Sequence, residues 1–104
     1  MKKLGFIGCG EMASAIINGL VNSKFIDNSE ILASTFTEKS ANLRKEELKI
    51  EVLTNNKHVA ENSEIIILAT KPKQIENVLK EIKEEINGKL VISIAAGVKT
   101  SKIE

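Results

Sequence analysis

Hydrophobic residues along this chain form short continuous runs that alternate with longer segments in which they recur at helical spacing. The continuous runs predict strands at residues 3–7, 31–34, 51–53, 64–69 and 90–94. The intervening segments predict helices at residues 12–21, 38–48, 56–61 and 74–86. Strands and helices that alternate with short connections favour right-handed crossovers and a Rossmann-like, doubly wound parallel sheet of about five strands.

The same pattern predicts which side of each element faces the core. The strand at residues 64–69 contains four consecutive aliphatic residues, which is typical of a strand covered on both faces. The helical residues expected to face inward are, in chain order, Ile16, Ile17, Leu20, Val21, Leu43, Leu48, Ile75, Val78, Leu79, Ile82 and Ile86. Asn87 and Gly88 are expected to end the last helix.

Length and composition narrow the class of protein. With 104 residues, 42% of them hydrophobic, residues 1–104 have room for one small domain with a modest core. The 15 Lys and Arg residues nearly balance the 14 Asp and Glu residues, and only 3% of residues are aromatic, so we expect neither nucleic-acid nor membrane partners. No apolar run is long enough for a signal sequence or a membrane span, and a single cysteine fits a cytoplasmic protein.

A glycine-rich turn with the pattern G-x-G-x-x-A follows the first predicted strand and opens the first predicted helix. In such a turn the first glycine permits a sharp bend, the second lets the backbone approach a pyrophosphate, and the small third residue lets helix and strand pack closely. The amides of the helix end then face the phosphates. The predicted cofactor-binding residues of this turn are Gly8, Cys9, Gly10, Glu11, Met12 and Ala13. The alternative is an ordinary tight turn that binds no cofactor. In either case we expect Cys9 to be a small loop residue and not a nucleophile.

The segment after the second predicted strand bears on which dinucleotide is bound. A carboxylate about 20 residues beyond the glycines would bond the adenosine ribose and repel a 2′-phosphate, but the first acid in this segment is Glu38. Hydroxyl groups stand there instead, on Ser34, Thr35 and Thr37, and Lys39 and Arg44 follow with positive charge. The segment favours NADP(H) over NAD(H), and the alternative is a solvated loop that accepts either cofactor.

Two further loops follow strands at the edge of the sheet where doubly wound folds bind ligands. The first contains Ala69, Thr70, Lys71 and Pro72, whose lysine could reach a cofactor or simply be solvated. The second contains Ala95, Ala96 and Gly97, small residues that could admit a flat ring or only make a turn. His58 is expected to be structural or solvated. Spacing indicates no metal site and no catalytic nucleophile with its base.

Three segments together resemble pyrroline-5-carboxylate reductase: FIGCGEMA at residues 6–13, ATKP at residues 69–72 and SIAAGV at residues 93–98. The similarity runs over the whole chain with matching spacing. It implies an NAD(P)H-dependent oxidoreductase that reduces a C=N bond, converting 1-pyrroline-5-carboxylate to proline in proline biosynthesis. It also implies that residues 8–13 hold the pyrophosphate, Ser34 and its neighbours the 2′-phosphate, Asn56 the adenosine ribose, and residues 69–72 and 95–97 the nicotinamide side.

The resemblance further implies a carboxy-terminal helical domain that forms the dimer and most of the imino-acid pocket. Because the chain ends at Glu104, we expect an amino-terminal fragment without that domain, inactive by itself and prone to self-associate through its last strand. Phe36 and Thr37 stand where many members have a basic residue, Thr70 replaces the more usual valine, and Glu11 replaces an uncharged amide. Alternative functions are another NADP-linked reductase of this fold, such as one that uses a deazaflavin, or a non-catalytic nucleotide-binding module.

Overall fold

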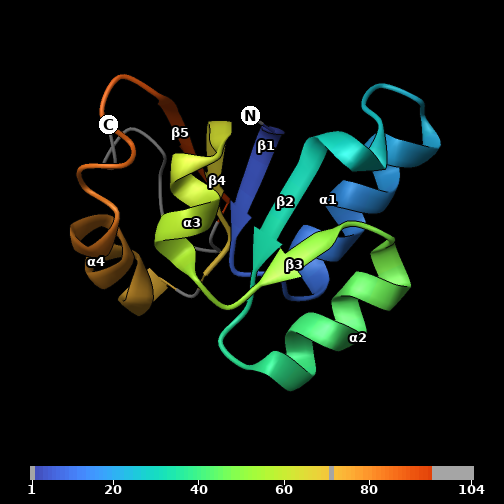
Figure 1. Cartoon of the computed structure of the whole chain (residues 1–104), viewed down its shortest axis with the longest axis horizontal. Helices are drawn as coiled ribbons and strands as arrows, with labels where there is room; N and C mark the ends of the chain where they lie inside the picture. Colours follow the sequence, from blue (N-terminus) through green and yellow to red (C-terminus); the bar gives the residue numbers. More distant parts are fainter. Residues whose placement is uncertain (1, 71, 95–104) are drawn as a thin grey trace.

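The computed structural model describes residues 2–70 and 72–94, and within them strands and helices alternate along the chain (Figure 1). In chain order the elements are β1 (Lys2–Ile7), α1 (Glu11–Asn22), η1 (Asn28–Glu30), β2 (Ile31–Ser34), α2 (Glu38–Leu48), β3 (Glu51–Leu53), α3 (Asn56–Glu61), β4 (Ser63–Leu68), α4 (Pro72–Glu81) and β5 (Leu90–Ser93). The bounds of β2, α2, β3 and α3 agree with the sequence prediction to the residue.

The strands form one parallel sheet in the order β3-β2-β1-β4-β5. This order is that of a doubly wound sheet, in which β2 and β3 are added on one side of β1 and β4 and β5 on the other, and it confirms the predicted fold class. Leu4 pairs with Ile31 on one side of β1 and with Ile65 on the other. The carboxyl ends of β1, β2 and β4 therefore meet at one edge of the sheet.

Helices cover both faces of the sheet (Figure 1). On one face α1 and α2 contribute Ile17, Ala41 and Leu48 to a core that includes Ile67, while on the other α3 and α4 contribute Val59 and Val78. Successive residues of β4 enter opposite cores, as expected for a strand covered on both faces.

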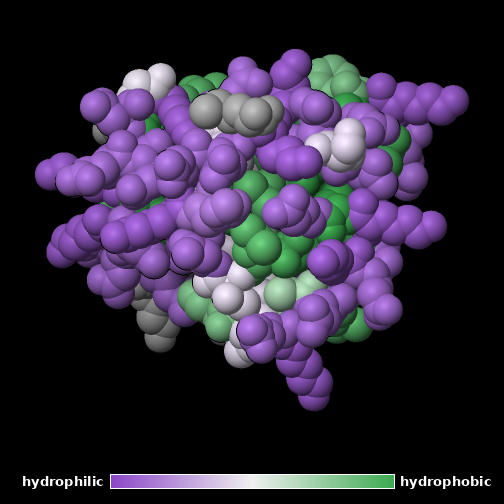
Figure 2. All heavy atoms as spheres, in the orientation of Figure 1, coloured by the Kyte–Doolittle hydropathy of each residue, from purple (hydrophilic) through white to green (hydrophobic). Residues whose placement is uncertain are grey.

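The face seen in Figure 2 is mostly hydrophilic, with hydrophobic side chains showing near its centre, over the area where β2 and β3 lie.

Side-chain caps and close contacts explain several element boundaries. The Oγ1 of Thr37 accepts a hydrogen bond from the amide of Ser40 at the start of α2, and the Oδ1 of Asn55 does the same for α3. Lys49 ends α2 in the left-handed conformation. Gly5 lets β1 approach β4, because a Cβ there would lie 2.1 Å from the Oγ of Ser63.

Two sequence predictions about packing were wrong. The last helix ends at Glu81 and not at residue 86, and turns follow it as far as Gly88, although Ile82 is fully buried. Apolar spacing predicts which side chains are buried, and consecutive turns can bury them as well as a helix can. Leu43 does not face inward: its side chain is 59% exposed, and Ala41 takes the inner position on α2.

Candidate functional site

The turn between β1 and α1 has the backbone geometry of a phosphate-binding loop. Gly8 has φ +89°, which strains any other residue, and a Cβ there would lie 2.9 Å from the Cγ2 of Thr70. Gly10 is extended, and a Cβ there would meet nothing within 4 Å, so its backbone borders open space. Ala13 is buried between helix and strand, whereas Met12 is exposed. Each small residue therefore has the environment that its predicted role requires.

The first turn of α1 presents amides that no capping side chain covers. Gly10 occupies the N-cap position and has no side chain that could accept their hydrogen bonds. The Oγ of Ser14 instead donates to the carbonyl of Gly10, at 2.8 Å. A phosphate placed over the turn would find free N–H donors and the positive end of the helix dipole.

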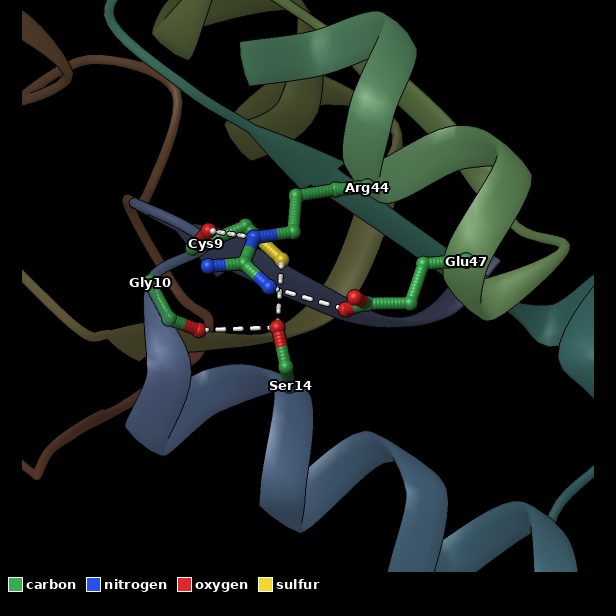
Figure 3. A network of polar contacts seen from close by, with 5 residues as sticks. All are labelled: Cys9, Gly10, Ser14, Arg44 and Glu47. Carbon is green, nitrogen blue, oxygen red and sulfur yellow. Dashed lines mark hydrogen bonds and ion pairs between the residues drawn. The ribbon is translucent and has the colours of Figure 1, made fainter.

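Cys9 and Arg44 fix this turn to the second helix (Figure 3). The Nε of Arg44 donates to the carbonyl of Cys9 at 3.1 Å, and its Nη1 pairs with the Oε1 of Glu47 at 2.8 Å. The sulfur of Cys9 is buried, 4.0 Å from the Oγ of Ser14. Burial raises the pKa of the Cys9 thiol, and the hydrogen bond between Cys9 and Ser14 and the charge of Arg44 oppose that rise only in part. Cys9 is thus a packed loop residue, as predicted, and a poor nucleophile.

A groove of about 400 Å³ lies where the loops after β1, β2 and β4 converge. It is lined by Gly8, Cys9, Gly10, Thr35, Phe36, Ser40, Leu43, Arg44, Ala69, Thr70 and Gln74. The folding of the sheet therefore brings together residues predicted separately from three loops. The phosphate turn lies between the other two loops, because β1 lies between β2 and β4 in the sheet.

Ser34, which the resemblance places at the 2′-phosphate, is hydrogen-bonded within the protein. It is fully buried at the end of β2, where its Oγ accepts from the amide of Gly8 at 3.2 Å and donates to the Oδ1 of Asn56 at 2.5 Å. The Nδ2 of Asn56 in turn donates to the Oε1 of Glu81 at 3.0 Å. Because its hydroxyl oxygen accepts from the amide of Gly8, Ser34 supports the glycine turn. The 2′-phosphate contact implied for Ser34 and the ribose contact implied for Asn56 stay predictions.

The loop after β2 contributes side chains of mixed character to the groove. Thr35 is buried, with its hydroxyl donating to the carbonyl of Thr37 at 2.8 Å. Phe36 and Leu43 are 66% and 59% exposed, and both border the groove, so an apolar surface faces it here. Arg44, with 19% of its side chain exposed, is the groove's cationic side chain among the described residues.

The remaining site predictions fall on less informative positions. Lys71, Ala95, Ala96 and Gly97 lie outside the described residues, so their roles stay predictions, while Glu11 begins α1 and Pro72 begins α4. His58 is exposed. Within residues 2–70 and 72–94 no three His, Cys, Asp or Glu side chains gather as metal ligands, and no helix there is long and apolar enough to cross a membrane.

Four groove residues were missed as site candidates by sequence reasoning: Phe36, Ser40, Leu43 and Gln74. Ser40 and Arg44 are four residues apart on α2, so helical spacing could have placed them on one face. Leu43 was assigned to the core because an apolar residue that borders a ligand groove has the same sequence signal as one that packs inside. Nothing in the sequence distinguished Gln74.

Comparison with known proteins agrees with this geometry. Residues 3–97 match the family model described as NADP oxidoreductase coenzyme F420-dependent. The chain is 41% identical to pyrroline-5-carboxylate reductase of Methanosarcina acetivorans over 99% of its own length and 38% of that protein. It superposes with a TM-score of 0.88 on a pyrroline-5-carboxylate reductase from Coxiella burnetii, 33% identical over 99% of this chain and 38% of that one.

A third similar protein was solved with a nucleotide. The pyrroline carboxylate reductase of Plasmodium falciparum, with NADP bound, superposes with a TM-score of 0.82 and is 31% identical, over 99% of this chain and 37% of its own. The chain thus spans less than two fifths of the length of these proteins. With its glycine turn, parallel sheet and match over residues 3–97, the chain belongs to the family described as NADP oxidoreductase coenzyme F420-dependent.

Proposed function

We propose that this chain is the dinucleotide-binding domain of an NADPH-dependent reductase that converts 1-pyrroline-5-carboxylate to L-proline. The observation that carries the proposal is the groove at the carboxyl ends of the strands, with Gly8 at a positive φ and uncovered helix amides on one side. Similarity to pyrroline-5-carboxylate reductases over nearly the whole chain supports the substrate. Because the chain spans 38% of the first of these relatives, turnover is proposed for the whole protein and not for this part alone.

The groove fits an extended dinucleotide. The pyrophosphate would lie over Gly8 and Gly10 at the start of α1, where a Cβ on Gly10 would otherwise fill the space. The adenosine half would extend along the side of β2, against Phe36 and Leu43, and the nicotinamide half along the side of β4, against Thr70. The bound cofactor supplies a hydride; the residues of this chain bind it and orient it.

The adenosine side of the groove favours NADPH. Arg44 and the hydroxyl of Ser40 border it, and among its lining residues no carboxylate would repel a 2′-phosphate. The relative from Plasmodium falciparum, which has NADP bound, supports the same choice. NADH remains the alternative cofactor, distinguished by the titration below.

The test is calorimetric titration of the chain with NADPH and with NADH. We expect NADPH to bind at least about tenfold more tightly, a difference of about 1.4 kcal/mol. Equal affinities would remove the NADP preference and keep the dinucleotide site. Binding of neither cofactor would overturn the proposed function of this chain.

A pair of glycine variants checks where the cofactor binds. Gly10→Val places a branched side chain in the open space over the turn, so the chain should fold normally and lose cofactor binding. Gly19→Val is the control, because a Cβ at Gly19 on α1 also meets nothing within 4 Å but lies outside the groove lining. Normal binding by Gly10→Val would contradict the placement of the pyrophosphate.

The family description favours one second candidate, a reductase that passes hydride between NADP and a deazaflavin. An assay of the whole protein with NADPH and each acceptor, 1-pyrroline-5-carboxylate or an oxidised deazaflavin, separates the two. A non-catalytic nucleotide-binding module would turn over neither.

We also propose a cytoplasmic location, supported by a buried, reduced cysteine. Copies of the chain are proposed to assemble through the edge strand β5, whose Leu90 is 58% exposed.

A further inference from the structure

Two buried oxygen atoms at the β4 side of the groove have no hydrogen-bond partner among the described residues. They are the Oγ1 of Thr70 and the Oε1 of Gln74. Both residues line the groove, and the Thr70 side chain is only 5% exposed. A buried polar atom without a partner is destabilising, so two together at one ligand groove point to a ligand that completes them.

Thr70 is placed where it can reach the centre of the groove. It lies directly against the phosphate turn, since its Cγ2 would be 2.9 Å from a Cβ on Gly8. Rotation about the Cα–Cβ bond of Thr70 brings its hydroxyl to the position of the methyl group, while the methyl group moves to the place of the hydrogen on Cβ. The hydroxyl can therefore face the turn through a change of rotamer.

The chemistry of the two atoms selects one part of a dinucleotide. A phosphate oxygen accepts hydrogen bonds and does not donate them, so it cannot satisfy the carbonyl oxygen of Gln74, which only accepts. The hydroxyls of a ribose both donate and accept, and they suit a threonine hydroxyl beside a glutamine carbonyl. The apolar wall of Phe36 and Leu43 lies on the other side of the turn, so the β4 side receives the second half of the molecule.

We propose that Thr70 and Gln74 hydrogen-bond the ribose that carries the nicotinamide, and that their side chains position the reactive ring. The inference rests on the proposed dinucleotide-binding function and adds two side chains to it. One consequence is that a change at Thr70 should have opposite effects on the stability of the free chain and on its affinity for the cofactor. Valine matches threonine in shape and has no hydroxyl, so Thr70→Val should stabilise the free chain while weakening cofactor binding.

The experiment compares three ligands on the wild-type chain and on Thr70→Val. The ligands are NADPH, 2′-phospho-ADP-ribose, which keeps the second ribose and lacks nicotinamide, and adenosine 2′,5′-bisphosphate, which lacks the second ribose. We expect Thr70→Val to weaken the binding of NADPH and of 2′-phospho-ADP-ribose about fivefold each. This is the change in affinity that the loss of one hydrogen bond of about 1 kcal/mol produces. Binding of adenosine 2′,5′-bisphosphate should not change, and the thermal midpoint of the free chain should rise.

Two further variants make the result specific. Thr70→Ser keeps the hydroxyl and should retain most of the affinity for 2′-phospho-ADP-ribose, although it loses the methyl contact with Gly8. Gln74→Met keeps the length of the side chain without its carbonyl and should weaken the same two ligands. Equal weakening of all three ligands by Thr70→Val would show a general structural effect and overturn the proposal.

Other outcomes also decide the matter. Weakening of NADPH alone would assign the contact to the nicotinamide ring and overturn the ribose contact. Unchanged binding of every ligand by both Thr70→Val and Gln74→Met would overturn it as well. If wild type binds none of the three ligands, the proposed function itself fails, whereas binding of adenosine 2′,5′-bisphosphate with no effect of either variant refutes only this inference.

Discussion

The turn after β1 and the loop after β2 border the same groove but are built in different ways. The turn depends on backbone conformation and buried contacts, with Gly8 at φ +89° and its amide bonded to the Oγ of Ser34. The loop places exposed side chains at the groove, Phe36 above all. Under the proposed function, the difference means that the turn would bind a pyrophosphate in general, whereas the loop and the adjoining face of α2 would select between NADPH and NADH.

The largest effect is expected at the turn itself. Gly8→Ala forces an alanine to φ +89° and brings its Cβ to 2.9 Å from Thr70, so the free energy of unfolding should fall by about 2–4 kcal/mol with loss of cofactor binding. Gly88→Ala is the matched control, because Gly88 has φ +80° but open space around its Cβ position. Urea denaturation of both variants measures the difference. Equal destabilisation would mean that the turn is not tightly packed against β4.

The next largest effect is expected where α2 meets the turn. Arg44→Gln removes the positive charge from the groove and the hydrogen bond to the carbonyl of Cys9, so NADPH affinity should fall about tenfold more than NADH affinity. Glu47→Gln is the control: it breaks an exposed ion pair and should change stability by less than about 1 kcal/mol. Calorimetric titration of each variant with NADPH and with NADH measures the affinities, and urea denaturation measures the stability of Glu47→Gln. An equal loss of affinity for both cofactors would mean that Arg44 supports the turn and does not bind the 2′-phosphate.

Phe36 should affect both cofactors alike. Its ring is 66% exposed at the groove, so Phe36→Ser should leave the thermal midpoint nearly unchanged and weaken NADPH and NADH each about fivefold, through lost contact with adenine. Phe25→Ser is the control, since Phe25 is 83% exposed and is not part of the groove lining. If the two phenylalanine variants bind equally well, the adenine does not pack on this loop.

The smallest effect is expected from the thiol in the turn. Burial raises the pKa of Cys9, so above about pH 9 the unfolded chain loses this proton while the folded chain keeps it. The unfolding free energy should therefore fall as pH rises from the ordinary thiol pKa toward the raised one. Cys9→Ala should remove this part of the decline, seen as a flatter curve of urea midpoint against pH between 8 and 10. Identical curves for wild type and variant would show that the folded thiol titrates normally.

The contrast between turn and loop also explains what could be predicted from the sequence. The glycine turn was predictable because its requirements fall on neighbouring residues at fixed spacing, and Gly8, Gly10 and Ala13 have the predicted environments. The partner of the Ser34 hydroxyl was not predictable, because it depends on how β1, β2 and α3 pack together. Leu43 shows the same limit, since its hydrophobicity could not reveal whether it faces the core or the groove.

The hydrogen bonds that run from Gly8 through Ser34 and Asn56 to Glu81 join four segments that are far apart in the sequence. The phosphate turn is therefore fully supported only after β1, β2, α3 and α4 have assembled, so a bound dinucleotide selects the completely folded chain. Ligand at a hundred times its dissociation constant adds about 2.7 kcal/mol to the stability of a protein that binds it only when folded. The lifetime of this protein in the cell would then follow the supply of its coenzyme.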